Sequence, residues 1–450
     1  MNDVAQGMKR GISHRPATPF VSTIEFLFLI FLSGACLVLT DFMDVNEPKW
    51  FLIRTVAPVL FGLVLLRDAF RRNERYFPVG PLGGLAVVFL GLHLASTLIA
   101  SNGGRAWTEA SELAGLVCAF FLAAKIASSE SGRDRILWTL VLIGVAVSGY
   151  GIAQHYGVDF MSWQENKEVL VSRGVSFFGH ATFTASVLIQ IIPVALGLLA
   201  TRKGWLARLL LTVICALMLY HLSFTGARMA TLSFVFTGAA VGCWIGIRSW
   251  RARRERGGRG LPLRAIAAAV AVVLIAGTSA GWFVVRAWQT KDSDLFAIRQ
   301  ASLALRIFHW ETASRIVFAH PVTGVGAGNY EVVSPSYWNA VEQMRTARNG
   351  RWMQQAHNEY LQTAAELGLP GIAVLFSLIA YGIVLALDVS MRARMPQERW
   401  LGVAMAASIG AIALDANITF SLQAPGSALL FWTMLGLIAG SRARLRADQV

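Results

Sequence analysis

Two arginines in this chain of 450 residues lie where positive charge is not expected. Arg228 falls in a very short connection between two apolar runs, and Arg306 lies among apolar residues of a predicted amphipathic helix, Leu303 to Phe318. A guanidinium group can bind two phosphate oxygens at once, so the two arginines could clamp a diphosphate, with Arg173 as a possible third member. Their separation along the chain does not by itself bring them together. Pairing with a nearby carboxylate or with lipid headgroups is the alternative for Arg228.

His357 is the candidate general base, because imidazole titrates near neutral pH. We expect it on a helix that begins near Met353 and ends near Gly368, at the outer membrane surface. Glu359 could orient or replace it, although positions two apart on a helix point in different directions. A structural role is the alternative for a lone histidine, and His180 and His320 are competing candidates.

Two other patterns indicate phosphate or metal binding only weakly. The glycine-rich stretch from Gly324 to Asn329 could cradle a phosphate, yet it matches neither a P-loop nor a dinucleotide fingerprint, so a tight turn is the alternative. Asp292 and Asp294 form an Asp-x-Asp pair of the kind that binds a divalent metal, but a two-residue pattern in a polar loop is weak. The four cysteines lack metal-ligand spacing. We therefore expect no metal site.

The elements that would position these residues are membrane-spanning helices. Hydrophobic residues make up 55% of the chain and charged residues only 15%, against roughly 25% charged in soluble proteins. Apolar runs long enough to cross a bilayer predict an all-α polytopic protein with about twelve spans. The predicted spans are centred near residues 30, 58, 90, 118, 145, 190, 214, 237, 275, 375, 409 and 432.

These spans divide the chain into three parts. Residues 1–286 hold nine predicted spans, residues 287–360 a long extracytoplasmic segment with amphipathic helices, and residues 361–450 the last three spans and a tail. Most of the 40 Lys and Arg residues gather in every second connection, including the run from Arg248 to Arg264. The positive-inside rule then predicts both termini in the cytoplasm and explains the net charge of +14 without nucleic acid.

The order of these motifs resembles the bacterial O-antigen ligase and O-antigen polymerase superfamily. The residues that carry the resemblance are Ser223 to Arg228, Arg306 with Trp310, Pro321 to Tyr330, His357 to Leu361, and Glu366 to Gly371.

The resemblance implies a GT-C-like, inverting glycosyltransferase that needs no metal and no cofactor. By motif position, His357 would be the catalytic base, while Arg228 and Arg306 would bind the diphosphate. The donor would be a glycan on undecaprenyl diphosphate, and the acceptor a sugar hydroxyl of lipid A-core oligosaccharide at the periplasmic face of the inner membrane. The long segment would then form one wall of the active site, and the connection carrying Arg228 the other.

Two other functions stay open at this point. A polymerase would have the same chemistry but use a second lipid-linked repeat unit as the acceptor. A transporter of lipid-linked glycans would be expected to carry carboxylates inside its spans for proton coupling, and Asp415 is almost the only one there. The ligase is therefore the expectation.

Overall fold

The computed structural model describes residues 19–39, 44–70, 77, 79–161, 173–255, 293–340, 342–344 and 354–447. In these ranges the chain forms helices and short 3-10 turns with no strand. The long helices are α2 Pro19–Leu37, α3 Glu47–Phe70, α4 Gly80–Ser96, α5 Gly103–Ala127, α6 Glu130–His155, α8 Ala181–Thr201, α9 Trp205–Phe224, α10 Arg228–Glu255, α12 Ser293–Ala319, α15 Glu359–Arg392, α16 Pro396–Asp415 and α17 Pro425–Ala447.

Seven of the described helices are long and apolar enough to cross a membrane, namely α3, α5, α6, α8, α9, most of α10, and α15. The prediction of an all-α polytopic membrane protein agrees with this architecture. Every predicted span centre except one falls inside a described helix. The ninth, near residue 275, lies outside the described residues. The total of twelve spans stays a prediction.

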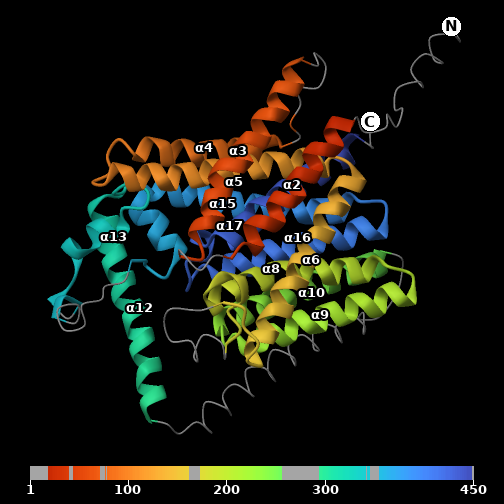
Figure 1. The fold of residues 1–450 in the computed structure, drawn as a ribbon. Helices are drawn as coiled ribbons and strands as arrows, with labels where there is room; N and C mark the ends of the chain where they lie inside the picture. Colours follow the sequence, from red (N-terminus) through yellow and green to blue (C-terminus); the bar gives the residue numbers. More distant parts are fainter. Residues whose placement is uncertain are drawn as a thin grey trace, which may run out of the picture.

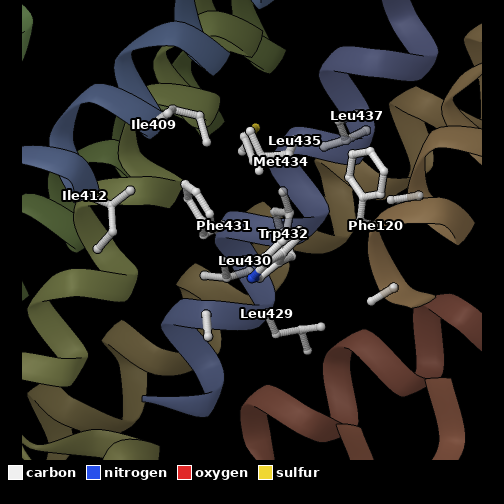
Figure 2. Packing of buried hydrophobic residues seen from close by; sticks show 14 of the residues in the cluster. Phe120, Ile409, Ile412, Leu429, Leu430, Phe431, Trp432, Met434, Leu435 and Leu437 are labelled. Carbon is white, nitrogen blue, oxygen red and sulfur yellow. The ribbon is translucent and has the colours of Figure 1, made fainter. Parts of the chain in front are cut away.

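Helix α17 forms the centre of the bundle and is buried along most of its length (Figure 2). It packs closely on α5: a Cβ added to Gly436 would lie 2.4 Å from the carbonyl oxygen of Phe120, and one added to Gly440 2.3 Å from that of Ala124. Small residues one helical turn apart allow two membrane helices to approach this closely. The glycines in the sequence of α17 thus allow α5 to pack closely against it.

The basic connections meet at one end of the bundle, where buried and partly buried carboxylates form ion pairs with some of their charges. Lys125 at the end of α5 contacts Asp68, and Arg133 at the start of α6 lies 3.5 Å from Glu398 at the start of α16. Arg442 near the end of α17 pairs with Asp388. The predicted alternation of basic and non-basic connections therefore corresponds to two different ends of the molecule.

Helix α12 differs from the rest in direction, since it runs across most other helices at the side of the bundle (Figure 1). It begins before the predicted Leu303 and ends at Ala319, as Pro321 predicts. After it come the short helix α13, Tyr330–Val333, and the 3-10 turn η2, Ser334–Tyr337.

The predicted helix around His357 is wrong at its start. Helix α15 begins at Glu359 rather than near Met353, because the Asn358 side chain accepts the N–H groups of Tyr360 and Leu361 and caps it. The predicted stop near Gly368 is confirmed: Gly368 has the non-helical angles φ 69° and ψ −172°, and two helices meet at this kink within α15, the second ending at Arg392.

Candidate active site at the non-basic end of the bundle

His357 immediately precedes the cap of α15, and its backbone is unusual. Its φ of 52° lies in the left-handed region, which non-glycine residues rarely adopt. Its ring packs edge-on against Phe420, with centroids 5.0 Å apart, and its carbonyl oxygen accepts a 3.4 Å hydrogen bond from Trp310 Nε1. Such strain persists only where the surroundings impose it, and it clusters at functional sites. The fold therefore holds the imidazole in a defined place.

Helix α12 places Arg306 beside His357. Arg306 is half-buried, and this burial lowers its pKa while the charge of Asp415 acts in the opposite direction. One turn further along, His309 lies 3.1 Å from Glu342 in a buried pair, and Trp310 reaches the His357 backbone. The α12 residues 306, 309 and 310 thus border the histidine together.

The connection between α9 and α10 closes another side. Arg173 donates a 2.9 Å hydrogen bond from Nε to the carbonyl oxygen of Thr225, and its guanidinium lies next to Gly226. Two residues on, Arg228 is exposed and starts α10. A cation at a helix N-terminus gains nothing from the helix dipole, so this position is not explained by helix stability.

Helices α10 and α16 bring Arg228 to the same end of the bundle as Arg306. They run antiparallel in contact, with Thr237 of α10 next to Gly410 of α16, so the start of α10 and the end of α16 point the same way. The last residue of α16 is Asp415, which interacts electrostatically with Arg306. The two predicted arginines therefore share one end of the molecule.

Positive charges lower the pKa values of two histidines in the site. Burial, followed by the charges of Arg306, His309 and His180, lowers the pKa of His357 to about 4. Partial burial, followed by Arg173 and Arg306, also lowers the pKa of His180. His357 is consequently a neutral imidazole at pH 7, able to accept a proton, and the cluster favours an anion beside it.

Asp415 is the functional candidate that the sequence had pointed to only for transport. It is fully buried, accepts a 2.6 Å hydrogen bond from Ser186 Oγ, and also contacts Thr419. Its carboxylate is the acidic group that acts on Arg306. A carboxylate at the outer end of a predicted span was the signal available, and its partner was hidden because Arg306 lies far away in sequence.

The glycine-rich turn binds a carboxylate of the protein itself. The N–H groups of Gly328 and Tyr330 donate to the Glu366 side chain over 3.0 and 3.3 Å, and those of Val325 and Gly326 donate to the backbone of α15. These donors are therefore engaged inside the protein. The structure supports the tight-turn interpretation of Gly324 to Asn329, with the turn docked on the helix that follows His357.

The other predicted residues lie elsewhere or are not described. Glu359 lines a cavity with Glu109, Glu112 and Glu366. His320 Nε2 lies 3.0 Å from the hydroxyl group of Tyr337 near the end of α12. Asp292 lies outside the described residues, and the side chain of Asp294 is not described.

Comparison with known families singles out the same part of the chain. Residues 210–376 match the model of a family described as O-antigen ligase. The matched stretch runs from α9 into α15 and includes Arg228, Arg306 and His357. A search of curated proteins found no match to the chain.

Proposed function

We propose that this chain, whose residues 210–376 match a family model described as O-antigen ligase, is an O-antigen ligase. It moves a glycan from undecaprenyl diphosphate to a sugar hydroxyl of lipid A-core oligosaccharide during lipopolysaccharide assembly. It does so in the bacterial inner membrane, with the active site facing the periplasm and both termini in the cytoplasm.

The observation that carries this proposal is the neutral His357 inside a positive cluster. Arg306 acts on His357 electrostatically, and Arg173 bonds the connection that leads to Arg228. A lipid diphosphate is an anionic leaving group that such a cluster can stabilise, more effectively in a low-dielectric cavity than in water. A neutral imidazole beside it can take a proton that a protonated one cannot.

The proposed reaction is one displacement. The acceptor oxygen attacks the anomeric carbon while His357 takes the hydroxyl proton. The bond between that carbon and the diphosphate oxygen breaks, and its electron pair leaves on undecaprenyl diphosphate, whose developing charge is held by Arg228 and Arg306. Attack from the opposite face inverts the anomeric configuration. The energy comes from the activated donor, so the step needs no nucleotide.

Removing the imidazole tests the chemistry. His357→Ala in purified protein, supplied with lipid-linked glycan and lipid A-core, should lose transfer by at least about a hundredfold, which is typical for a general base. His155→Ala is the matched control, since the His155 ring stacks on Phe224 at the end of α9, with ring centroids 4.2 Å apart. Full transfer by His357→Ala would remove the general-base role.

Removing either arginine tests the diphosphate clamp. Arg228→Ala and Arg306→Ala should each weaken use of the donor strongly, because each deletes a guanidinium opposite the diphosphate. Arg105→Ala is the control: Arg105 starts α5 at the same end of the bundle and pairs with Glu331. Near-normal turnover by Arg228→Ala or Arg306→Ala would exclude that residue from the clamp.

The alternative with the same chemistry is an O-antigen polymerase, whose acceptor is another lipid-linked repeat unit. Incubation with lipid-linked glycan, with and without lipid A-core, separates the two. The ligase forms product only when core is present, whereas chain growth without core would identify a polymerase. A transporter would move the glycolipid across a vesicle without forming any glycosidic bond.

A further inference from the structure

Behind the His357 segment lies a cavity of about 70 Å³ with an acidic lining. Its walls come from α3, α4, α5, α15 and α17 and from the 3-10 turn η3, Ser421–Gln423. Four carboxylates line it, from Glu109, Glu112, Glu359 and Glu366. Glu359 follows His357 by two positions, so this cavity adjoins the segment that carries the candidate base.

Among the described residues, cations contact these four carboxyl groups only weakly. Arg54 approaches Glu112 only to 3.9 Å, and Arg105 forms its ion pair with Glu331. Lys49, although buried nearby, donates to the carbonyl oxygens of Val38 and Val45. Buried carboxylates without a cation are unfavourable, so either protons or a bound cation must balance them.

Glu359 shows that the cavity has room for a partner. Its side chain is only 6% exposed, and Oε1 accepts a 3.4 Å hydrogen bond from Gln423 Nε2. Its other oxygen, Oε2, is buried and has no hydrogen-bond partner in the described structure. Glu366 differs, because its carboxylate accepts hydrogen bonds from the N–H groups of Gly328 and Tyr330 and from Gln362 Nε2. Its backbone carbonyl oxygen accepts one from the N–H group of Gly326. Glu359 therefore has unused acceptor capacity, and the ion pair described for Glu112 is the long 3.9 Å approach of Arg54.

The lining favours an organic cation over a metal ion. Within the described ranges, no three His, Cys, Asp or Glu side chains lie close enough to hold a metal. Aromatic side chains, however, form part of the wall, from Trp50, Phe89 and Trp432. Carboxylates together with aromatic faces are the surroundings in which an alkylammonium group binds well. At about 30 Å³ for each water molecule, the cavity has room for such a group.

We propose that this cavity binds a primary alkylammonium group, with Glu112 and Glu359 as its anionic partners. Resting on the glycosyl transfer proposed above, we further assign this ammonium to the acceptor, as an amine near the hydroxyl that reacts. The site then has two oppositely charged halves: arginines hold the anionic donor, and carboxylates hold a cationic part of the acceptor. An acceptor carrying acidic groups at that position would be disfavoured.

Binding of the free ion tests the cavity independently of any reaction. Ethylammonium chloride should raise the melting temperature of the purified full chain by about 2 °C more than sodium chloride at equal ionic strength. Glu112→Gln and Glu359→Gln should each abolish this difference. Glu25→Gln is the matched control, because Glu25 is also 6% exposed but pairs with Arg135 at the basic end.

Equal shifts with ethylammonium and sodium in the wild-type protein would overturn the proposal and indicate that protons alone neutralise the carboxylates. If Glu112→Gln and Glu359→Gln do not fold, Glu109→Gln serves instead, since Glu109 is only half-buried. If the difference between ethylammonium and sodium persists in Glu25→Gln and also in the cavity variants, the ion binds elsewhere. That result would also overturn the proposal.

A separate experiment tests whether the ammonium group belongs to the acceptor. Transfer to an acceptor with a free amine should show a KM about tenfold lower than transfer to the same acceptor after N-acetylation, and Glu112→Gln should remove the preference. If ethylammonium binds but the two acceptors react alike, the ion comes from solution and the acceptor assignment is wrong. If His357→Ala still transfers glycan, the proposed mechanism fails while the binding result stands.

Discussion

At the scale of single residues, His357 combines a strained backbone with a depressed pKa. Arg306 and His357 were identified from their types and motif positions, since a polar side chain inside an apolar pattern is visible in a sequence. Their relation was not visible: the effect of Arg306 on the His357 pKa depends on α12 crossing the start of α15. Asp415 was undervalued for the same reason.

The low pKa of His357 predicts the acid limb of the reaction. The protonated imidazole cannot act as a base, so activity is present above the pKa and is lost as the pH falls through it. In the free enzyme that pKa is about 4, because burial and then the Arg306 charge oppose protonation. A plot of kcat/KM against pH should therefore stay flat from pH 7 to about pH 5.

The same electrostatic argument predicts how the acid limb of the pH profile shifts when a charge near His357 changes. Arg306→Gln removes a positive charge and should shift the acid limb to higher pH in the residual activity. A bound diphosphate opposes Arg306 in the same way, so the limb of kcat should lie at higher pH than that of kcat/KM. An acid limb that stays in place in Arg306→Gln would contradict the electrostatic coupling.

At the scale of elements, the start of α15 controls where His357 lies. The N–H groups of Tyr360 and Leu361 each donate a 3.0 Å hydrogen bond to Asn358 Oδ1. Asn358→Ala should destabilise the protein by about 1 kcal/mol and reduce kcat, because the cap fixes the residue before it. Asn358→Asp keeps the cap and should retain most of both. Thermal unfolding and kcat measured on the two variants make this comparison, and an unaltered kcat in Asn358→Ala would show that the cap does not position His357.

The glycine-rich turn and the break in α15 form a second local constraint. Gly324 and Gly368 have φ of 63° and 69°, and a Cβ on either would lie 2.3 Å from backbone of the opposite segment. Gly324→Ala and Gly368→Ala should each lower the free energy of unfolding by roughly 2 to 4 kcal/mol, from strain and overlap together. In Gly84→Ala the added Cβ meets nothing within 4 Å, so this helical control should be neutral or slightly stabilising. Chemical unfolding of all three in detergent tests the contrast, and equal stability of all three variants would argue against the constraint.

The sequence predicted these elements unevenly. Apolar length predicted the long helices well because a bilayer permits few alternatives. The start of α15 was wrong because the amphipathic pattern was extended through Asn358, although asparagine is a strong N-cap residue. The glycines of the turn were recognised as a turn, but their partner Glu366 was not, since a contact between backbone and a distant side chain leaves no local pattern.

At the scale of the whole molecule, charge distinguishes the two ends of the bundle. One end holds the ion pairs of Lys125, Arg133 and Arg442, and the other holds the His357 cluster and the acidic cavity. Positive residues near span ends favour the cytoplasmic side. The orientation predicted from the sequence would therefore place the proposed site on the outer face, where the proposed lipid-borne donor and acceptor meet, and this orientation stays a prediction.

Cysteine labelling tests this orientation directly. Tyr156 is exposed at the end of α6 near the candidate site, and Gln397 is exposed at the start of α16 beside the basic ion pairs. In a background with the four native cysteines replaced by alanine, a membrane-impermeant maleimide should label Tyr156→Cys in cells whose outer membrane alone is permeabilised. Gln397→Cys should react only after the inner membrane is opened. The reverse labelling pattern would show that the protein has the opposite orientation in the membrane. His357 would then face the cytoplasm, where a reaction with a periplasmic acceptor is impossible.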